Sequence, residues 1–363
     1  MLKGIKVLDL SRVLAGPLCT MMLGDMGADV IKVERPEGGD ETRGWGPPFD
    51  PDGLSAYYLS INRNKLSAAL DLDRVEDREL IDLLLARTDV VVENFRPGVL
   101  SRRGLDAESV RRRHPSIVWC TIGGFADEPG RAGYDFVVQA ESGWMSITGE
   151  PSGSPMKHGI ALADVVAGKD AAIAVLGALV ERARTGQGRV VTVTLEQSAE
   201  AALVNVAQNV LVSGSAPKRW GNAHANLVPY QLFDASDRPI VIAVGSDAQW
   251  LACARALDLA ALAGDESLRT NAGRLAARER VTSALAARLS ERPAAEWRER
   301  LDVVGVPTGV VRSVLEVLAD AGASPVTGMA PAVPGSVRYR PPVLGEHTAM
   351  VRGHGWGAFA ALP

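Results

Sequence analysis

Two apolar segments near the N-terminus flank a short helical pattern, and this arrangement restricts the fold more than any other feature. The segments Lys6–Leu10 and Asp29–Glu34 each have the length and apolar content of a buried strand. Between them, Pro17 suits the first turn of a helix, and an amphipathic pattern runs to Met26. A strand, a helix and a second strand of this length form a β-α-β unit, so we predict a parallel sheet.

The same alternation continues along the chain. We predict further strands near Ala68–Leu72, at the segment ending in Asn94 and at Ile117–Phe125, with an amphipathic helix over Arg74–Arg87. The repetition predicts an α/β fold with a large, Rossmann-like, doubly wound domain, in which ligands lie beyond the carboxyl ends of the strands. The residues at these ends are Arg12–Gly16, Arg35, Asn94–Arg96 and Gly123-Gly124.

A long run rich in Ala, Val and Leu follows Asp164. Its composition predicts one helix over Val165–Arg184, closed by Gly186. The β-branched segment after it predicts another strand, and Glu196–Val212 predicts a further helix. An aspartate at the start of a helix has two explanations. It can stabilise the helix dipole as an N-terminal cap or first-turn residue, or it can react with a ligand, and the residues alone favour the structural role.

Composition excludes several classes of protein. The chain has 363 residues and a net charge of -4, which argues against a nucleic-acid or membrane-surface binder. No apolar run is long and uncharged enough to span a bilayer, so we expect no membrane association. Three widely separated cysteines fit a reduced cytoplasmic protein, and the histidines lack ligand spacing, so we expect no metal site.

The middle of the chain predicts a change of domain. Residues 213–226 are rich in Gly, Ser, Pro and Asn and read as a linker. After them, two antiparallel strands around Ser236-Asp237, three helices and a strand at Pro307–Val311 predict a smaller α+β domain over 227–323. We therefore assign 1–212 and 324–363 to the large domain, with the Pro- and Gly-rich tail packing back on it.

Three groups of motifs go beyond a generic α/β pattern. They read SRVLAGPLCTMMLGDMGADVIKVERPEGGDETRGW, then SINRNKLSAALDL with VVVENFRPGVL, and finally YDFVVQAESGWMSITGE with GIALADVVAGKDAAIAVLGALVERARTGQG. Together they closely resemble the class III CoA-transferase family, over essentially the whole chain. The resemblance is nearest to the members that use succinyl-CoA and dicarboxylic acids. It implies an interlocked homodimer, in which each chain is an open ring threaded by the other.

The resemblance also implies a mechanism. The family's nucleophile is an aspartate in the motif ALADVVAG, which makes Asp164 the catalytic residue and reverses the preference for a cap. A carboxylate can attack an acyl-CoA thioester to give a mixed anhydride, and the released thiolate can then form an aspartyl-CoA thioester. CoA and acyl-CoA are substrates in this scheme, so no metal, ATP or tightly bound cofactor is expected.

The family's CoA contacts map onto residues of the predicted strand-end loops. They are Val13, Ala15, Arg35, Leu70, Asn94, Phe95, Arg102 and Tyr134. Arg35 and Arg102 suit phosphates, although a solvated surface is the alternative for most arginines of this chain. Core packing is the alternative for Phe95 and Leu70. Gly123-Gly124 and Val244-Gly245-Ser246 are candidates for shielding the anhydride from water.

Two departures from the formyl-CoA type concern the substrate. Leu14 stands where that type has glutamine, and the segment GNAHANLVPY replaces a longer glycine-rich lid. Both differences argue against oxalate and formate. They favour larger dicarboxylic acids of the hydroxymethylglutarate, citramalate or mesaconate kind, with succinyl-CoA as donor. Candidate groups for the distal carboxylate are Arg43, Arg63, Lys157 and His158.

Three other functions compete with CoA transfer. The related α-methylacyl-CoA racemases use a histidine where this chain has Tyr134, and a tyrosine with a pKa of about 10 is a poor base near neutral pH. A non-catalytic acyl-CoA-binding protein would bind CoA and keep its affinity when Asp164 is changed. A nicotinamide oxidoreductase is disfavoured because the first strand-to-helix turn lacks the G-x-G-x-x-G pattern.

Overall fold

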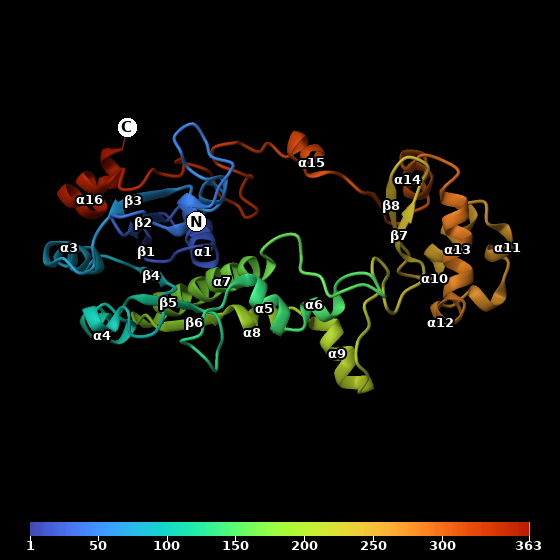
Figure 1. The fold of residues 1–363 in the computed structure, drawn as a ribbon, viewed down its shortest axis with the longest axis horizontal. Coiled ribbons are helices and arrows are strands. Elements are labelled where there is room, and N and C mark those ends of the chain that lie inside the picture. Colours follow the sequence, from blue (N-terminus) through green and yellow to red (C-terminus); the bar gives the residue numbers. More distant parts are fainter. Residues whose placement is uncertain (363) are drawn as a thin grey trace. The chain divides into compact units, whose positions relative to one another are not determined.

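The computed structural model describes residues 1–362 and divides the chain into two compact units (Figure 1). The first unit comprises Met1–Met145, Lys157–Ser215 and Ala321–Pro363, and the second comprises Ser146–Met156 and Ala216–Asp320. Residues 146–156 thus group with the smaller unit, whereas the sequence-based division placed them in the large domain. The domain boundaries themselves stay a prediction.

The first unit is built on a six-stranded parallel sheet with the strand order β3-β2-β1-β4-β5-β6. Its strands are β1 (Lys6–Asp9), β2 (Asp29–Glu34), β3 (Lys65–Ala69), β4 (Val90–Glu93), β5 (Val118–Gly123) and β6 (Val190–Thr194). This is the order of the doubly wound dinucleotide-binding fold, in which the connections reverse direction between β1 and β4. The prediction of a Rossmann-like doubly wound sheet is confirmed.

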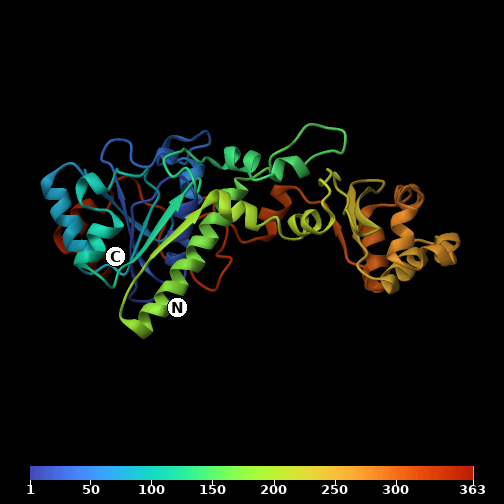
Figure 2. The same ribbon diagram turned by 90° about the horizontal axis from the view of Figure 1, so that it is seen from below.

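Helices cover both faces of this sheet (Figure 2). One apolar cluster joins the sheet to α1 (Ala15–Asp25), α7 (Leu162–Thr185) and α8 (Leu195–Ala201). The other joins the opposite face to α3 (Val75–Leu85), α4 (Ala107–Arg113) and α16 (Thr348–His354). Because both faces are covered, the strands read as nearly continuous apolar runs, which is typical of buried parallel sheets.

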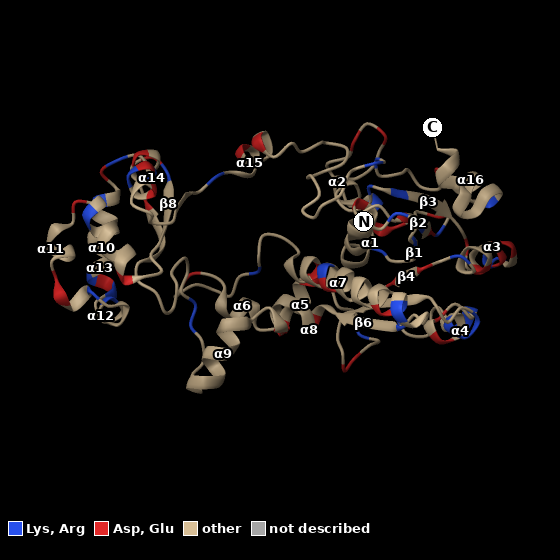
Figure 3. Ribbon diagram, turned by 180° about the vertical axis from the view of Figure 1, so that it is seen from behind, with Lys and Arg blue, Asp and Glu red and all other residues tan. Residues whose placement is uncertain are grey.

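Two strands break that apolar pattern with fully buried lysines. Lys32 lies in β2 and Lys65 opens β3, and both are 0% exposed; Figure 3 marks charged residues along these strands. The sequence prediction placed the strand at Ala68–Leu72 and was wrong about its start, because β3 begins at the buried Lys65. Lys65 Nζ contacts Asp9 Oδ2 at 3.0 Å, the Pro17 carbonyl at 2.9 Å and Asn62 Oδ1 at 2.9 Å.

The C-terminal tail packs on the first unit. The Gly345 amide donates to Ser67 Oγ at 2.9 Å, and Thr348 Oγ1 accepts from the Ala69 amide at 2.9 Å. Farther on, the indole N–H of Trp356 donates to the Leu84 carbonyl at 3.0 Å. The tail therefore covers the outer edge of the sheet beside β3, where an unpaired strand would otherwise be open.

One predicted helix is two helices. The segment Glu196–Val212 was expected to be continuous, but α8 ends at Ala201 and α9 (Val204–Ser213) starts after a break. Val204 has a φ of 36°, a left-handed conformation that no continuous helix of L-residues allows. The remaining short elements of this part are η1 (Glu41–Gly44), α2 (Ala56–Leu59), η2 (Ser101–Arg103), α5 (Asp135–Glu141) and η4 (Gly355–Ala361), and α6 (Trp144–Ile147) includes residues of both units.

The second unit is a small α+β structure, as predicted. Its antiparallel sheet has the order β7-β8-β9 and packs against helices around the buried indoles of Trp250 and Trp297. The strands are β7 (Tyr230–Asp234), β8 (Pro239–Ala243) and β9 (Thr308–Val310). The helices are α10 (Asp247–Ala256), α11 (Ala260–Ala263), η3 (Glu266–Leu268), α12 (Asn271–Ala276), α13 (Arg278–Leu289), α14 (Ala294–Val303) and α15 (Val314–Asp320). Among residues 1–362, no helix combines the length and apolarity needed to cross a bilayer.

Candidate active site

A cavity opens at the reversal point of the large sheet, beyond the carboxyl ends of β1 and β4. This is where doubly wound proteins bind ligands. Several predicted site residues line it together: Val13, Ala15, Asn94, Phe95, Tyr134 and Asp164. Gly123 and Gly124 also line it, as do three arginines, Arg12, Arg96 and Arg131. The fold thus gathers into one cavity segments that lie far apart in the sequence.

Asp164 does not cap its helix. It sits in the first turn of α7, whose cap residue Ala161 makes no side-chain cap bond. Asp135, at the start of α5, supplies that cap from outside, because its Oδ1 accepts from the amides of Ala163 at 2.8 Å and Asp164 at 3.4 Å. The carboxylate of Asp164 is therefore not engaged in capping, although as a first-turn acidic residue it still interacts favourably with the dipole of α7.

The environment of Asp164 favours a reactive carboxyl group. Burial raises the pKa of Asp164 to about 7, with a further rise from the neighbouring charge of Asp135, while a hydrogen bond from the backbone of Ala15 lowers it. A pKa near neutral leaves the group largely ionised in mildly alkaline solution, but poorly solvated. A desolvated carboxylate at the wall of a cavity can act as a nucleophile or a base.

The contact between Ala15 and Asp164 depends on a close approach of two helices. A Cβ added to Gly168 would lie 2.7 Å from the Ala15 carbonyl oxygen. Only glycine at this position lets the first turn of α1 approach α7 so closely. The sequence motif ADVVAG therefore places an aspartate and, one helical turn later, the glycine that brings the backbone of Ala15 up to it.

Sequence reasoning missed two polar residues beside Asp164. Asp135 is one, and its Oδ2 accepts from Gln139 Nε2 at 2.7 Å, while Gln139 Oε1 accepts from the His158 amide at 2.9 Å. Tyr57 in α2 is the other, and burial together with the charges of Asp164 and Asp135 raises the pKa of its phenol to about 12. The only sequence signal for Asp135 was its position as an acidic residue at the start of a predicted helix. No sequence pattern indicated Tyr57.

The turn between β1 and α1 is strained. Val13 has a φ of 70°, a conformation rarely adopted by β-branched residues. The side chain of Asn94 binds the backbone of Arg12, the residue before Val13. Its Oδ1 accepts from the Arg12 amide at 2.9 Å, and its Nδ2 donates to the Arg12 carbonyl at 2.7 Å. Backbone strain that the surroundings enforce is concentrated at functional sites. Asn94, predicted as a CoA contact, here shapes the wall of the cavity.

A second cavity adjoins the first, and Arg12 and Phe95 line both. Predicted contacts Arg35 and Leu70 line it, with Leu70 only 1% exposed. Arg103 also lines it and forms an ion pair with Asp73 at 2.7 Å. Arg102, the predicted phosphate ligand, is exposed in η2 and is not among the residues lining these two cavities. Its neighbour Arg103 instead lines the second cavity, together with Arg12 and Arg35.

The structure removes two candidates for binding a distal carboxylate. The Arg43 guanidinium pairs with Glu34 at 2.7 Å, and that of Arg63 pairs with Asp25 at 2.7 Å. Both side chains are under 10% exposed, at 9% and 4%. They hold the fold together instead of facing a ligand. Lys157 is exposed, and His158 packs edge to face against Trp144.

The shielding candidates fall in different units. Gly123-Gly124 lines the cavity with Asp164. Val244-Gly245-Ser246 belongs to the second unit, where the Gly245 amide donates to Gln249 Oε1 at 2.9 Å. Its shielding role stays a prediction. Within residues 1–362, no group of three or more His, Cys, Asp or Glu side chains could hold a metal ion.

Comparison with known proteins places this geometry in a functional context. The family model described as "CoA-transferase family III" matches residues 2–329. The chain is 40% identical to the succinyl-CoA:glutarate CoA-transferase of Mus musculus, over 96% of this chain and 84% of the relative. It is 42% identical to the succinate–glutarate CoA-transferase of Agrobacterium fabrum, over 88% of this chain and 82% of the relative.

A solved structure has the same fold. The crystal structure of a CAIB/BAIF family protein from Brucella suis matches with a TM-score of 0.85 and 41% sequence identity. The match covers 97% of this chain and 98% of the other. Both units are therefore shared along nearly their whole length.

Proposed function

This chain belongs to CoA-transferase family III, and we propose that it moves CoA from a dicarboxylic acyl-CoA to a second carboxylic acid through covalent intermediates on Asp164. The single observation that carries this assignment is the environment of the Asp164 carboxylate. It is buried at the wall of a cavity, Asp135 takes over the capping role, and burial raises its pKa to about 7. A carboxylate arranged in this way is held for chemistry and costs the fold stability.

The proposed reaction proceeds through exchange of bonds of similar energy. Asp164 Oδ attacks the thioester carbonyl, the C–S bond breaks, and a mixed anhydride forms as CoA leaves as its thiolate. The thiolate then attacks the aspartyl carbonyl, which releases the donor acid and leaves an aspartyl-CoA thioester. The acceptor carboxylate attacks that thioester to give a second anhydride. The thiolate finally attacks the acceptor's acyl carbon, which restores Asp164.

The chain's own residues support each anhydride step. The Ala15 amide and the N-terminus of α7 present positive dipoles to the oxygen atoms of Asp164. The backbone around Gly123-Gly124 lines the same cavity and is suited to exclude water from an anhydride. Arg12 and Phe95 line both this cavity and the adjoining cavity of Arg35 and Arg103. An extended substrate such as CoA suits this pair of adjoining cavities.

The relatives support dicarboxylic substrates. Two of them are named for succinate or succinyl-CoA and glutarate, at 40% and 42% identity. We propose succinyl-CoA as donor and a dicarboxylic acid of similar length as acceptor. Arg96 and Arg131 line the cavity of Asp164 and replace Arg43 and Arg63 as candidates for the distal carboxylate. Arg131 already pairs with Glu141, so Arg96 is the better candidate.

A substrate panel tests this function. Purified protein would be incubated with succinyl-CoA and, one at a time, glutarate, mesaconate, citramalate, oxalate and formate, and each new CoA thioester would be measured by mass spectrometry. We expect glutaryl-CoA or another dicarboxylyl-CoA to form, with the free succinate appearing in equal amount. Hydrolysis of succinyl-CoA without any acceptor thioester, or no reaction with any acid, would contradict the proposal.

The active form is proposed to be a homodimer of interlocked chains. Large apolar side chains are exposed on helices of both units: Ile173 and Val180 on α7, Leu211 and Val212 on α9, and Val314 and Leu315 on α15. Exposed apolar residues repeated along helices support a partner surface. Light scattering coupled to gel filtration is expected to give twice the chain mass, and a monomer would contradict this part.

A reducing, cytoplasmic location is also proposed. All three cysteines, Cys19, Cys120 and Cys253, are buried and free. Burial raises the pKa of each thiol, which keeps it protonated and unreactive. Fluorescence of a tagged protein in cell fractions would test the location.

A further inference from the structure

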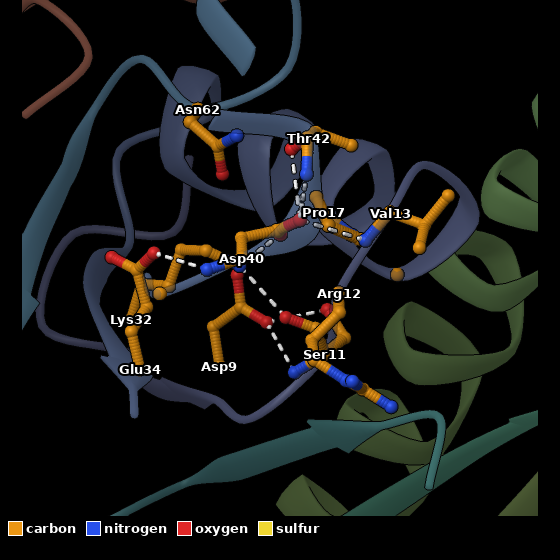
Figure 4. Close-up of polar contacts among 12 residues, drawn as sticks. Asp9, Ser11, Arg12, Val13, Pro17, Lys32, Glu34, Asp40, Thr42 and Asn62 are labelled. Carbon is orange, nitrogen blue, oxygen red and sulfur yellow. Dashed lines mark hydrogen bonds and ion pairs between the residues drawn. The ribbon is translucent and has the colours of Figure 1, made fainter. Parts of the chain in front are cut away.

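We propose that the buried ion pair between Lys32 and Asp40 is a positioning device for the nucleophile: it holds the strained turn that carries the Ala15 amide to Asp164. The inference rests on the proposed function of Asp164, but the contacts that carry it are independent of any substrate. Figure 4 shows Asp40 beside Lys32, Thr42 and Val13. None of these residues except Val13 was a candidate from the sequence.

Side chains accept from or donate to every backbone polar group from the Ser11 amide to the Val13 amide. Lys32 Nζ donates to the Ser11 carbonyl at 2.7 Å, and Asp40 Oδ1 accepts from the Val13 amide at 3.3 Å. Asp9 accepts from the Ser11 amide at 2.9 Å, and the side chain of Asn94 binds both the amide and the carbonyl of Arg12. The ion pair thus holds the chain on both sides of Arg12, just where the backbone enters its left-handed conformation at Val13.

The two partners also hold each other. Lys32 Nζ lies 3.0 Å from Asp40 Oδ2, and both side chains are 0% exposed. Burial would lower the pKa of Lys32, but Asp40, Asp9 and Glu34 outweigh it and raise the pKa. Burial likewise would raise the pKa of Asp40, but Lys32 and hydrogen bonds from Thr42 lower it. Both groups are therefore charged in the folded protein. Substituting either one removes the opposite charge that the other faces at 3.0 Å.

Stability alone does not explain such a pair. Replacing a buried ion pair by apolar residues is often neutral or stabilising, because the desolvation penalty can exceed the attraction between the charges. What apolar residues cannot do is donate to the Ser11 carbonyl and accept from the Val13 amide. Those two bonds fix the direction in which the chain enters α1, and Ala15 is the first residue of that helix. The pair therefore sets the position of an amide that faces the reacting carboxylate.

Two variants separate positioning from stability. Lys32→Met removes the cation paired with the buried Asp40 carboxylate, so both the melting temperature and the turnover are expected to fall. The double variant Lys32→Met/Asp40→Leu removes both charges, so most of the lost melting temperature should return. Its kcat at saturating succinyl-CoA should stay lower than wild type by on the order of 100-fold, because a small misplacement of reacting groups has an effect of this size.

Asp25→Asn provides a matched control. It unpairs Arg63, another buried cation of the first unit, but far from the turn, so it should lower the melting temperature and leave kcat within about twofold. A backbone readout needs no activity: amide hydrogen exchange in the peptide spanning Val13 and Ala15 should accelerate in the double variant and not in Asp25→Asn.

Each outcome decides the inference. A double variant with wild-type kcat, or with wild-type protection at Val13 and Ala15, would overturn it. A double variant as unstable as Lys32→Met would overturn it as well, because the pair would then support the fold as a whole. If wild-type protein transfers no CoA, the proposed function fails, and the exchange measurement alone still tests whether the pair holds the turn.

Discussion

The two ends of helix α1 are anchored by the same chemical device and serve different purposes. At the C-terminal end, Asp25 pairs in bidentate fashion with Arg63, at 2.9 and 2.7 Å. At the N-terminal end, Lys32 and Asp40 form a pair at 3.0 Å. Both pairs are nearly or completely buried, and each also binds backbone of a neighbouring segment. What differs is which backbone each pair binds.

The C-terminal pair ties distant parts of the chain together. Arg63 Nη1 donates to the Thr327 carbonyl at 2.8 Å, and the Ser336 amide donates to the Asp25 carbonyl at 2.9 Å. An acidic residue in the last turn of a helix is unfavourable beside the helix dipole, and Arg63 compensates for it. The Asp25–Arg63 pair thus binds the C-terminal tail to the first unit, and we expect it to contribute to the free energy of unfolding.

The N-terminal pair holds the turn at Val13 and not a remote segment. Next to that turn lies a carboxylate with a raised pKa, a glycine that permits a close helix contact, and a second carboxylate. The presence of a buried ion pair alone thus does not tell whether it serves stability or positioning. The backbone atoms that each pair binds indicate its role, and the roles of the pairs at the two ends of α1 can be distinguished by experiment.

The largest effect is expected from Asp164→Asn. This variant keeps the shape of the side chain and removes the nucleophile, so CoA exchange should fall by on the order of 10⁴-fold or more. The same variant should be more stable than wild type at pH 8, by about 1 to 4 kcal/mol, because one pKa unit corresponds to about 1.36 kcal/mol. Activity assays and denaturant unfolding at pH 8 measure the two effects.

The sign of the stability effect depends on pH. The pKa of Asp164 is raised in the folded protein, so ionisation there opposes folding above about 7 and costs nothing below the ordinary value of 3.8. The gain from Asp164→Asn should therefore disappear between pH 7 and pH 4. Equal stabilisation at both pH values, or retained exchange activity, would contradict the role given to this carboxylate.

A smaller loss of activity is expected from Gly168→Ala. The added methyl group would lie 2.7 Å from the Ala15 carbonyl and must push the first turn of α1 away from α7. We expect kcat to fall by about 10- to 100-fold, and a crystal structure to show Ala15 displaced. Gly177→Ala, on the same helix with open space around it, is the matched control and should leave kcat unchanged.

At the other end of α1, Asp25→Asn should act on stability. Loss of one partner strands the buried charge of Arg63, so unfolding should become easier by about 3 kcal/mol. Hydrogen exchange should accelerate in the tail segment around Thr327 and Ser336, which this pair anchors. If turnover fell by more than the fraction of folded protein, the Asp25–Arg63 pair would also affect activity, which would contradict the different roles given to the two ends of α1.

The smallest effect is expected from Asp135→Asn. The variant can still accept from the Ala163 amide through its side-chain oxygen, so the cap on α7 is kept. Its amide nitrogen replaces the oxygen that accepts from Gln139, so that hydrogen bond is lost. Removing the neighbouring charge should lower the pKa of Asp164, so the acidic limb of kcat should move down from near pH 7 by about one pH unit. Burial remains, so the limb should stay above pH 4, and an upward move would contradict the assigned cause.

The elements that follow local patterns could be predicted, and those that depend on distant partners could not. Helix α7 and the parallel strands follow from composition and periodicity. The buried lysines were missed, because a lysine in a strand reads as solvent-facing until Asp9 and Asp40 are seen beside it. Arg43 and Arg63 were wrong candidates for the same reason, since Glu34 and Asp25 already pair with them.

The site shows the same limit. The family motif pointed to Asp164, but its alternative role as a cap could be dismissed only when Asp135 was found in that position. Asp135 lies in a separate helix, so no local pattern connects it with the start of α7. The cavity likewise joins Val13, Asn94 and Tyr134 through the order of the strands, which the sequence predicts only as a class.

The central claim is that Asp164 becomes acylated, and trapping tests it most directly. The protein would be mixed with succinyl-CoA in the presence of hydroxylamine, which converts an aspartyl anhydride or thioester to a stable hydroxamate, and digested for peptide mass spectrometry. We predict a hydroxamate at Asp164 that requires the donor and is absent from Asp164→Asn. Modification at another residue, or rapid CoA exchange with no modification at Asp164, would contradict it.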